Sequence, residues 1–396
     1  MRQGQMEALW NRHTAEWRDP AQIASQWRDA SQVDPKLLVS SAHGEWWNIL
    51  EQLGITLFIT REYEHLVLAL SARGGRPRVT FFPVPHPSGL TVDRAARRMY
   101  LASTRNPNQI YVLKPVAGLL ARTDTSVRLR PSSPFVPVAT AFYPGSLYIH
   151  DLALIGGDLY ANAVGHNAVV KLEAEGRFRR VWWPKCVERA GKPVFERNYI
   201  QLNSIAAGQS PQDSYYSASS CHLGRLRPGH LKYKVDGQGV IFSGRTRQPF
   251  CSGLTRPHSA RMWKGRVWVA NSGYGELGYA RNGGFEAVCR LPGWTRGLCL
   301  TRGIAFAGTS RVIPRFSRYA PGLDRDRSRC GVHAVCLKTA RVLGSIEWPA
   351  ANQIFAIDWI SDSASQGFLF ETPRRGSDQE LALFYRYLTD NNSGAK

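Results

Sequence analysis

The chain has 396 residues, of which 43% are hydrophobic, enough for a large buried core. Its 51 lysines and arginines outnumber 30 acidic residues, so the formal net charge of +21 directs attention to anionic partners. The cations are scattered in short groups, such as Arg177, Arg179 and Arg180, and match no known nucleic-acid-binding motif. A basic, solvated surface accounts for most of this charge, and nucleic acid is disfavoured as a partner.

The sequence offers no signal for a membrane or secreted protein. It contains no run of about 18 apolar residues, and its N-terminus lacks the apolar stretch of a secretory signal. The seven cysteines form no CxxC pair, which disfavours a disulfide framework or a thiolate zinc site. We expect a cytoplasmic protein without a transmembrane segment.

Residues 1–36 differ from the rest of the chain. Trp10, Trp17 and Trp27 punctuate a polar, charged stretch that predicts a short helical extension outside the main domain. From residue 37 to 390, apolar runs of roughly five to eight residues alternate with Gly, Pro, Asn and Asp. This alternation predicts many short antiparallel strands.

Six segments of the strand-rich region share one repeat frame. They are residues 87–92, 149–154, 202–207, 257–262, 295–300 and 354–359. Most are followed by a turn and further strands, and units of about 40–60 residues with four strands are typical of a β-propeller. The fold class that we predict is all-β, a six-bladed β-propeller.

The two ends of the strand-rich region complement each other. The frame at 354–360 lacks a complete blade after it, whereas the early strands at 55–60, 66–72 and 79–84 lack an innermost strand. Pairing 354–360 with 55–60 would leave no open edge. We therefore predict one domain over residues 37–390, closed by strands from both termini.

Innermost strands line the axis of a propeller, so equivalent frame positions face one centre. The second frame position holds Ser88, His150, Asn203, His258, Arg296 and Phe355. We predict that the polar residues His150, Asn203, His258 and Arg296 converge on an axial pocket. The alternative is a channel filled with water and satisfied polar side chains.

Two chemistries suit the histidines. His150, His258 and the amide oxygen of Asn203 could together hold a divalent transition metal, although the set has no carboxylate ligand. Without a metal, His150 and His258 could act as acid and base.

Arg296 suits an anionic substrate because its planar guanidinium binds a carboxylate or phosphate through two hydrogen bonds. Substrate contacts are expected from Arg296, Asn203, Asp151 and Ser88, and catalytic roles from His150, His258 and Arg296.

Other polar segments have weaker functional signals. Asn162, His166 and Asn167 could form a mouth loop or a turn, and the glycine-rich segment 271–278 lacks the strand-to-helix context of a phosphate-binding loop. His86 lies between two prolines and is interpreted as a loop residue.

The same landmarks resemble an uncharacterised bacterial propeller family of conserved hypothetical proteins, which contain a domain of unknown function and are sometimes joined to tetratricopeptide repeats. The resemblance extends over most of residues 50–360. It rests on the residues around His150, Asn203, His258 and Arg296, on segments 271–278 and 330–332, and on Gln353 to Phe355. This chain has Asp151 where the family has Glu, and Ala356 near a position where the family has an acid. The resemblance implies a propeller and brings no established activity.

Two classes of function remain open. The first is an enzyme, with or without a metal, that acts on a small polar or anionic substrate in the axial pocket. The second is a non-catalytic propeller that binds a protein or an acidic polymer through its basic faces. Fold alone does not distinguish them.

Overall fold

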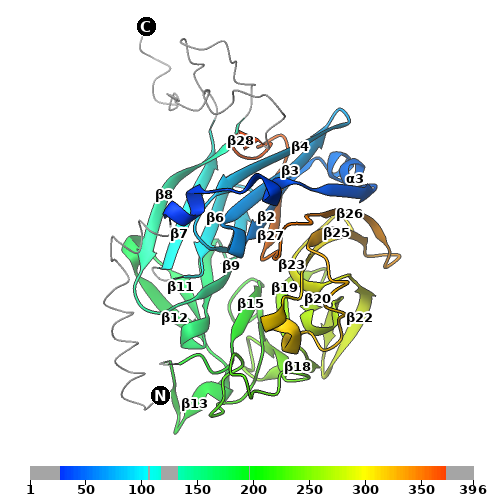
Figure 1. Ribbon diagram of the computed structural model, residues 1–396. Helices are drawn as coiled ribbons and strands as arrows, with labels where there is room; N and C mark the ends of the chain where they lie inside the picture. The colour runs from blue at the N-terminus through cyan, green and yellow to red at the C-terminus, as the bar shows by residue number, and fades with distance from the viewer. Residues whose placement is uncertain (1–26, 106–107, 117–132, 196, 372–396) are drawn as a thin grey trace.

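The computed structural model describes residues 27–105, 108–116, 133–195 and 197–371, which form a β-propeller of six blades around one axis (Figure 1). The closing blade has the order β27 (Ile357–Ser361), β2 (Ile55–Arg61), β3 (Leu66–Arg73), β4 (Arg76–Pro83) and β28 (Phe370–Glu371). The next two blades are β5 (Pro87–Asp93), β6 (Arg98–Ser103), β7 (Asn108–Pro115) and β8 (Phe135–Tyr143), then β9 (Ile149–Ile155), β10 (Asp158–Ala163), β11 (Ala168–Leu172) and β12 (Phe178–Trp182).

The fourth blade comprises β15 (Leu202–Ala206), β16 (Tyr215–Ala218), β17 (Gly239–Ser243) and β18 (Pro249–Leu254), and the fifth β19 (Pro257–Trp263), β20 (Arg266–Asn271), β21 (Glu276–Arg281) and β22 (Gly284–Arg290). The sixth comprises β23 (Trp294–Thr301), β24 (Ile304–Ser310), β25 (Gly331–Cys336), β26 (Val342–Glu347) and β1 (Ser41–Gly44). A hairpin of β13 (Glu188–Arg189) and β14 (Lys192–Pro193) lies outside the blades. The six-bladed fold class is confirmed.

The ring closes where strands from opposite ends of the chain pair. β27 runs antiparallel to β2, with Ile357 opposite Ile59 and Ser361 opposite Ile55. The pairing continues beyond the strand, because the Phe355 N–H donates to the Thr60 carbonyl at 2.8 Å. The predicted pairing between 354–360 and 55–60 is confirmed. It covers the edge of β2 that faces the axis.

An amphipathic helix covers the sixth and closing blades near the N-terminus. α3 (Trp46–Leu53) buries Trp46, Ile49 and Leu50, whose spacing places them on one helix face. The helix ends at Gly54, whose left-handed conformation (φ 59°) is readily adopted by glycine. Trp46 is fully buried and packs edge to face on Phe306 of β24 at 5.8 Å.

The N-terminal segment is described only in part. Residues 1–26 lie outside the described residues, as do residues 372–390 at the other end of the predicted domain. Residues 27–31 are helical, and Trp27 packs edge to face on Tyr111 of β7 at 5.8 Å. The boundary between a helical extension and the propeller stays a prediction. In the described part of the chain, no helix is long and apolar enough to cross a membrane.

A series of hydrogen bonds joins neighbouring blades around the axis. In each, a side chain of one blade donates to the carbonyl at the first frame position of the next blade. The pairs are Ser88 to Ile149 (2.8 Å), Asn162 to Leu202 (2.8 Å), Asn203 to Pro257 (2.9 Å), Ser272 to Thr295 (2.6 Å) and Ser310 to Ile354 (3.2 Å). These bonds satisfy buried polar groups and fix the inner strands relative to one another.

Candidate functional site

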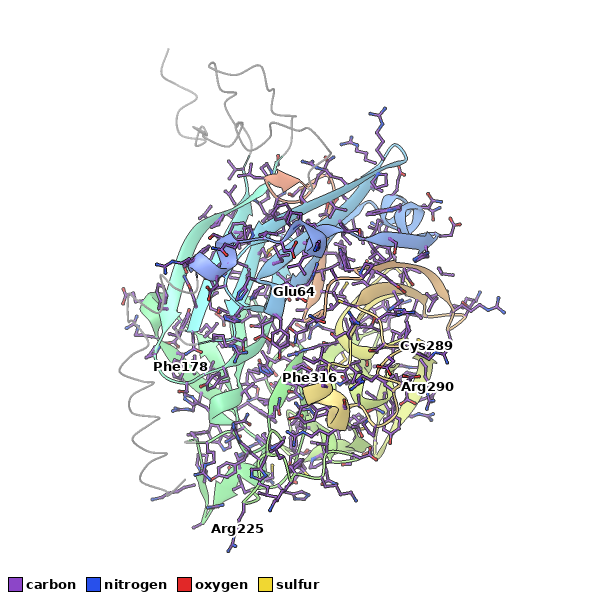
Figure 2. All side chains as sticks on the ribbon, viewed as in Figure 1. Glu64, Phe178, Arg225, Cys289, Arg290 and Phe316 are labelled. Carbon is purple, nitrogen blue, oxygen red and sulfur yellow. The ribbon has the colours of Figure 1, made fainter. Side chains whose placement is uncertain are left out.

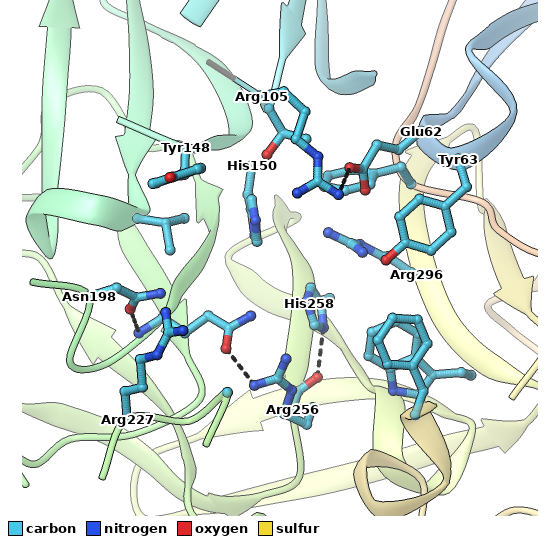
Figure 3. Close-up of a pocket in the computed structure, with 17 residues that line it drawn as sticks. Glu62, Tyr63, Arg105, Tyr148, His150, Asn198, Arg227, Arg256, His258 and Arg296 are labelled. Atoms are coloured by element: carbon cyan, nitrogen blue, oxygen red, sulfur yellow. Dashed lines mark hydrogen bonds and ion pairs between the residues drawn. The ribbon is translucent and has the colours of Figure 1, made fainter. Parts of the chain in front are cut away.

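An axial cavity of about 440 Å³ opens where the inner strands begin. His150 of β9, His258 of β19 and Arg296 of β23 line it together with Phe355, so four blades contribute the second residue of the frame. Figure 3 shows His150, His258 and Arg296 facing one common space. The structure thus brings together three of the four residues that the frame predicted, and a volume of this size suits a small metabolite.

The residue just before the frame supplies a second set of lining side chains. Tyr148, Gln201 and Arg256 occupy this position and all line the cavity. Each has a left-handed backbone, with φ of 49°, 49° and 55°, which non-glycine residues rarely adopt. His86, before the first frame, has φ of 44° as well, and the repetition of an unfavourable conformation at equivalent positions of four blades indicates that the backbone turns there into the inner strand.

Connections between second and third strands complete the wall. They supply Glu62 and Tyr63 of η3 (Glu62–Glu64), Arg105 after β6, and Phe316 of η8 (Pro314–Tyr319). Additional lining residues are Thr104, Val164, Asn198, Arg227, Gly229 and Trp294. In Figure 2, Phe316 lies near the middle of the view, over the centre of the ring.

Arg296 is a buried cation without a counter-ion in the described structure. Its residue is only 5% exposed, and its guanidinium carbon lies 3.3 Å from the centre of the Phe355 ring. Its side chain makes no hydrogen bond or ion pair with another described residue. Burial lowers the pKa of Arg296 to about 10, with nearby Glu62 opposing this shift, so the guanidinium is still charged at neutral pH. An anion in the cavity would complete its environment.

Arg256 provides a second guanidinium. It is also 5% exposed, and its Nη1 donates to Gln201 Oε1 at 2.6 Å. The group lies 4.4 Å from the centre of the Tyr319 ring, and its buried Nε has no partner among the described residues. Burial lowers the pKa of Arg256 to about 10, which leaves it protonated at neutral pH.

His258 is held in one orientation by its Nδ1. This atom lies 2.8 Å from the Arg256 carbonyl oxygen and 3.2 Å from Ser272 Oγ. Because a carbonyl only accepts, Nδ1 carries the hydrogen and the neutral ring keeps a lone pair on Nε2. Burial first, then the charges of Arg296 and Arg256, hold the pKa of His258 well below its usual range.

His150 has the same neutral state. Its ring meets Phe355 edge to face at 5.6 Å, and its buried Nδ1 has no hydrogen-bond partner among the described residues. Burial and the charge of Arg296 lower the pKa of His150 well below 6.5, whereas an interaction with the Asn203 carboxamide acts in the opposite direction. Two neutral imidazoles therefore share the cavity with buried cations.

The cavity wall is strongly cationic overall. Its described lining includes the arginines Arg105, Arg227, Arg256 and Arg296, and Glu62 as an acidic residue. Glu62 is engaged by Arg105 at 3.4 Å and lies 3.9 Å from His86. This excess of guanidinium groups produces a positive potential in a partly desolvated space.

Three predicted site residues do not line the cavity. Ser88 is fully buried, and its hydroxyl donates to the Ile149 carbonyl at 2.8 Å, with the Ala102 carbonyl oxygen also near at 3.1 Å. Asn203 is 2% exposed, and its Nδ2 donates to Pro257 and to Ser219. The Ser88 hydroxyl and the Asn203 Nδ2 are thus used between strands and blades, whereas the buried Asn203 Oδ1 has no hydrogen-bond partner among the described residues and its carboxamide interacts with His150.

Asp151 points away from the same space. As the third residue of the frame it faces the opposite side of the strand from His150, and its carboxylate accepts two hydrogen bonds from Arg261. Substrate binding by Asp151 and Ser88 has no support in this geometry.

The asparagines of the weaker candidate segments make hydrogen bonds to the backbone. Asn162 Oδ1 accepts from the His150 backbone N–H at 3.1 Å, and Asn167 Oδ1 accepts from Tyr199 N–H at 2.8 Å. Asn271 accepts from the Thr255 N–H at 2.7 Å, and Gly275 has φ of 67°. Asn162, on β10, therefore joins β9 to the next blade through Leu202, whereas turn chemistry accounts for Asn167 and the segment 271–278.

Sequence reasoning missed the arginine that accompanies Arg296. Arg256, Gln201 and Tyr148 each stand one residue before the frame, so extending the frame by one position would have identified them. Glu62, Arg105 and Phe316 come from connections of differing length, which carry no repeat signal.

The family model described as a domain of unknown function (DUF4915) matches residues 44–368. The chain belongs to this family. The resemblance to a propeller family with a domain of unknown function is thereby confirmed, the joining to tetratricopeptide repeats stays a prediction, and the match spans all six inner strands. A search of curated proteins finds no match.

Solved structures with similar architecture include a chain of a nidogen/laminin complex, with a TM-score of 0.50, 7% identity, and coverage of 77% of this chain and 98% of the other. Two propeller enzymes are more distant in shape, each with 14% identity and a TM-score of 0.42. The match to a putative gluconolactonase covers 67% of this chain and 79% of the gluconolactonase chain. The match to the PQQ-bound aldose sugar dehydrogenase from Streptomyces coelicolor covers 78% of this chain and 98% of the dehydrogenase chain. Identities this low show the fold alone.

Proposed function

We propose that this DUF4915 propeller binds a small anionic molecule in its axial cavity, with Arg296 as the principal contact. The observation that carries the proposal is the burial of the Arg296 guanidinium at 5% exposure without a hydrogen bond or ion pair to another described residue. Buried charges in proteins are ordinarily paired, because removal from water is costly for an isolated ion. A carboxylate or phosphate supplies the missing partner.

Arg256 extends this anion site. Its Nε lacks a partner, while Gln201 fixes its Nη1, so the guanidinium is oriented before the ligand arrives. Preorganised donors bind an anion without an additional ordering cost. Arg105 and Arg227, which also line the cavity, add long-range attraction for a negatively charged ligand.

The neutral histidines give the site a capacity for proton transfer. The Nε2 lone pair of His258 can accept a hydrogen bond or a proton from a ligand hydroxyl, because its Nδ1 is committed to the Arg256 carbonyl. A bound anion would offset the charges of Arg296 and Arg256 and so raise the pKa of both imidazoles. The second part of this proposal is that the protein catalyses a reaction of the bound molecule.

A transition metal is the competing occupant. Two neutral imidazoles suit such an ion, but the surrounding guanidiniums repel a cation. In addition, the described residues include no group of three or more His, Cys, Asp or Glu side chains that could hold a metal. The charge balance therefore favours an anion.

Thermal unfolding in a panel of small anions tests the proposal. Citrate, succinate, gluconate, phosphate and glucose 6-phosphate would be compared at constant ionic strength, and a specific ligand should raise Tm with a saturable concentration dependence. Arg296→Gln should abolish the shift, whereas Arg245→Gln, at a side chain 75% exposed, should retain it. Equal shifts in both variants would place the anions on the general surface.

A further inference from the structure

The connection between β16 and β17 displays apolar side chains to solvent. Leu231 is 84% exposed and Leu226 is 38% exposed, both within residues 225–234, which we name the basic leucine loop. Single exposed leucines are ordinary on a protein surface. Two leucines on one protruding connection need an additional explanation.

The basic leucine loop also concentrates positive charge. Arg225, Arg227, Lys232 and Lys234 fall within its ten residues, which include no Asp or Glu. Arg225, Lys232 and Lys234 are exposed, and none forms an ion pair with another described residue. In Figure 2, Arg225 projects from the lower edge of the molecule, away from the blades.

The body of the protein holds this loop in place. Arg318 of η8 donates from Nη1 to the His230 carbonyl and from Nη2 to the Gly229 carbonyl, both at 2.8 Å. Pro228 is buried, and the Tyr233 N–H closes a turn on the His230 carbonyl at 3.0 Å. The leucines are consequently displayed by a fixed backbone, which limits the entropy lost when they contact a partner.

The neighbouring β13–β14 hairpin enlarges the basic edge. Its base shares one apolar cluster with the segment just before the basic leucine loop, through Cys186 and Val187 on one side and Cys221 and Leu223 on the other. The hairpin region adds the exposed cations Lys185, Arg189 and Lys192. β13 lies at the same lower edge in Figure 1.

We propose that this edge docks onto an anionic lipid surface. Leu226 and Leu231 would enter the boundary between headgroups and acyl chains, while Arg225, Lys232 and Lys234 would remain against the anionic headgroups. Basic side chains and inserted apolar side chains together provide the two signals that reversible membrane attachment requires. A nucleic acid would satisfy the cations but would offer the leucines no apolar environment.

Docking in this way has a geometric consequence for the axial cavity. Arg227 and Gly229 of the same loop line that cavity, so its mouth would lie close to the lipid surface. The lipid contact uses different side chains from the anion contact of Arg296, and either one can fail without the other.

Vesicle cosedimentation of the full chain tests the proposal. We expect binding to phosphatidylcholine vesicles that contain phosphatidylserine, little binding to phosphatidylcholine alone, and loss of binding at high salt. Leu226→Ser/Leu231→Ser should weaken the binding about tenfold or more. The control Val39→Ser/Val138→Ser alters side chains that are 62% and 50% exposed elsewhere on the surface, and should bind normally.

Two charge-reversal double variants distinguish the effect of charges in the loop from the effect of the net charge of the protein. Lys232→Glu/Lys234→Glu should abolish vesicle binding, whereas Arg73→Glu/Arg76→Glu, at the exposed β3–β4 turn, changes net charge equally and should weaken it far less. Equal losses in the two pairs, or normal binding by the leucine double variant, would overturn the proposal. A third outcome would assign the edge to nucleic acid. In that outcome the protein binds duplex DNA and not vesicles, and DNA binding is lost in the lysine variant but kept in the leucine variant.

Discussion

Asp151 and Arg261 lie 110 residues apart in sequence and form a two-point ion pair near the propeller axis, with Arg261 Nη1 and Nη2 at 2.7 and 3.0 Å from the two carboxylate oxygens. The Asp151 carboxylate also accepts from the Ile205 N–H at 3.0 Å, so it connects β9, β15 and β19 of three consecutive blades. Arg261 lines a separate cavity of about 250 Å³ formed by later residues of the inner strands. The pair therefore joins three blades at a part of the inner strands that does not line the anion site.

Removing the charge of Asp151 should destabilise the fold. Its side chain is 4% exposed and that of Arg261 is 20% exposed, so Asp151→Asn leaves a largely buried guanidinium without its counter-ion, at a cost of about 3 kcal/mol. Urea unfolding would measure the loss. Asp158→Asn is the matched control, because its 50% exposed carboxylate pairs with Lys171 and should contribute less than about 1 kcal/mol. Similar losses in the two variants would contradict the interblade role.

Glycine should be better tolerated than alanine at position 201. Gln201 has φ of 49°, where a Cβ is unfavourable by roughly 1–2 kcal/mol, and either substitution removes the side chain that orients Arg256. We expect Gln201→Gly to be more stable than Gln201→Ala by about 1 kcal/mol in urea unfolding. Anion affinity should fall in both, because Arg256 loses its fixed partner. Alanine as the more stable variant would show that the left-handed backbone costs nothing here.

Acid should destabilise the protein before its carboxylates titrate. Burial and nearby arginines depress the folded-state pKa of His258 below the ordinary value near 6.5, so the unfolded chain binds more protons as the pH falls through 6.5. The free energy of unfolding should decline with falling pH, by up to about 1.4 kcal/mol per unit for each such histidine. His258→Asn should show a shallower decline between pH 6.5 and 5, with the wild-type slope retained above pH 7.5. Parallel curves throughout would rule out a depressed pKa.

Purified protein should contain little bound transition metal. Elemental analysis after purification without a metal-affinity tag should give far less than one ion per chain, because Arg256 and Arg296 make the cavity unfavourable for a cation. His150→Ala and His258→Ala are the comparison. Nearly one ion per wild-type chain, absent from both folded variants, would establish the metal site instead.

The repeat frame predicted most of the fold because each inner strand begins at the same distance from a turn. It brought together His150, His258 and Arg296, which line one cavity because long side chains at one frame position reach the axis, while their catalytic and binding roles stay predictions. Ser88 and Asn203 share that position, but the Ser88 hydroxyl and the Asn203 Nδ2 donate to carbonyls of the next blade. Whether a polar group is consumed in such a bond depends on the spacing of blades, which no local pattern encodes.

The cluster of arginines around the cavity could not be predicted from the sequence for a different reason. Arg256 belongs to a left-handed turn before the strand, and Arg105 follows the second strand of another blade. Arg256 stands one position before the repeat frame and Arg105 lies in a connection, so neither occupies the second frame position from which the site was predicted. The overall charge of +21 pointed to an anion without indicating where it binds.

A crystal structure with the anion that raises Tm most is the most direct test of the central claim. We expect a carboxylate or phosphate within hydrogen-bonding distance of the Arg296 guanidinium, with Arg256 as a second donor and no metal between His150 and His258. The same crystals of Arg296→Gln should lack the ligand. An anion confined to the outer surface, with a metal ion or water alone beside Arg296, would contradict the account.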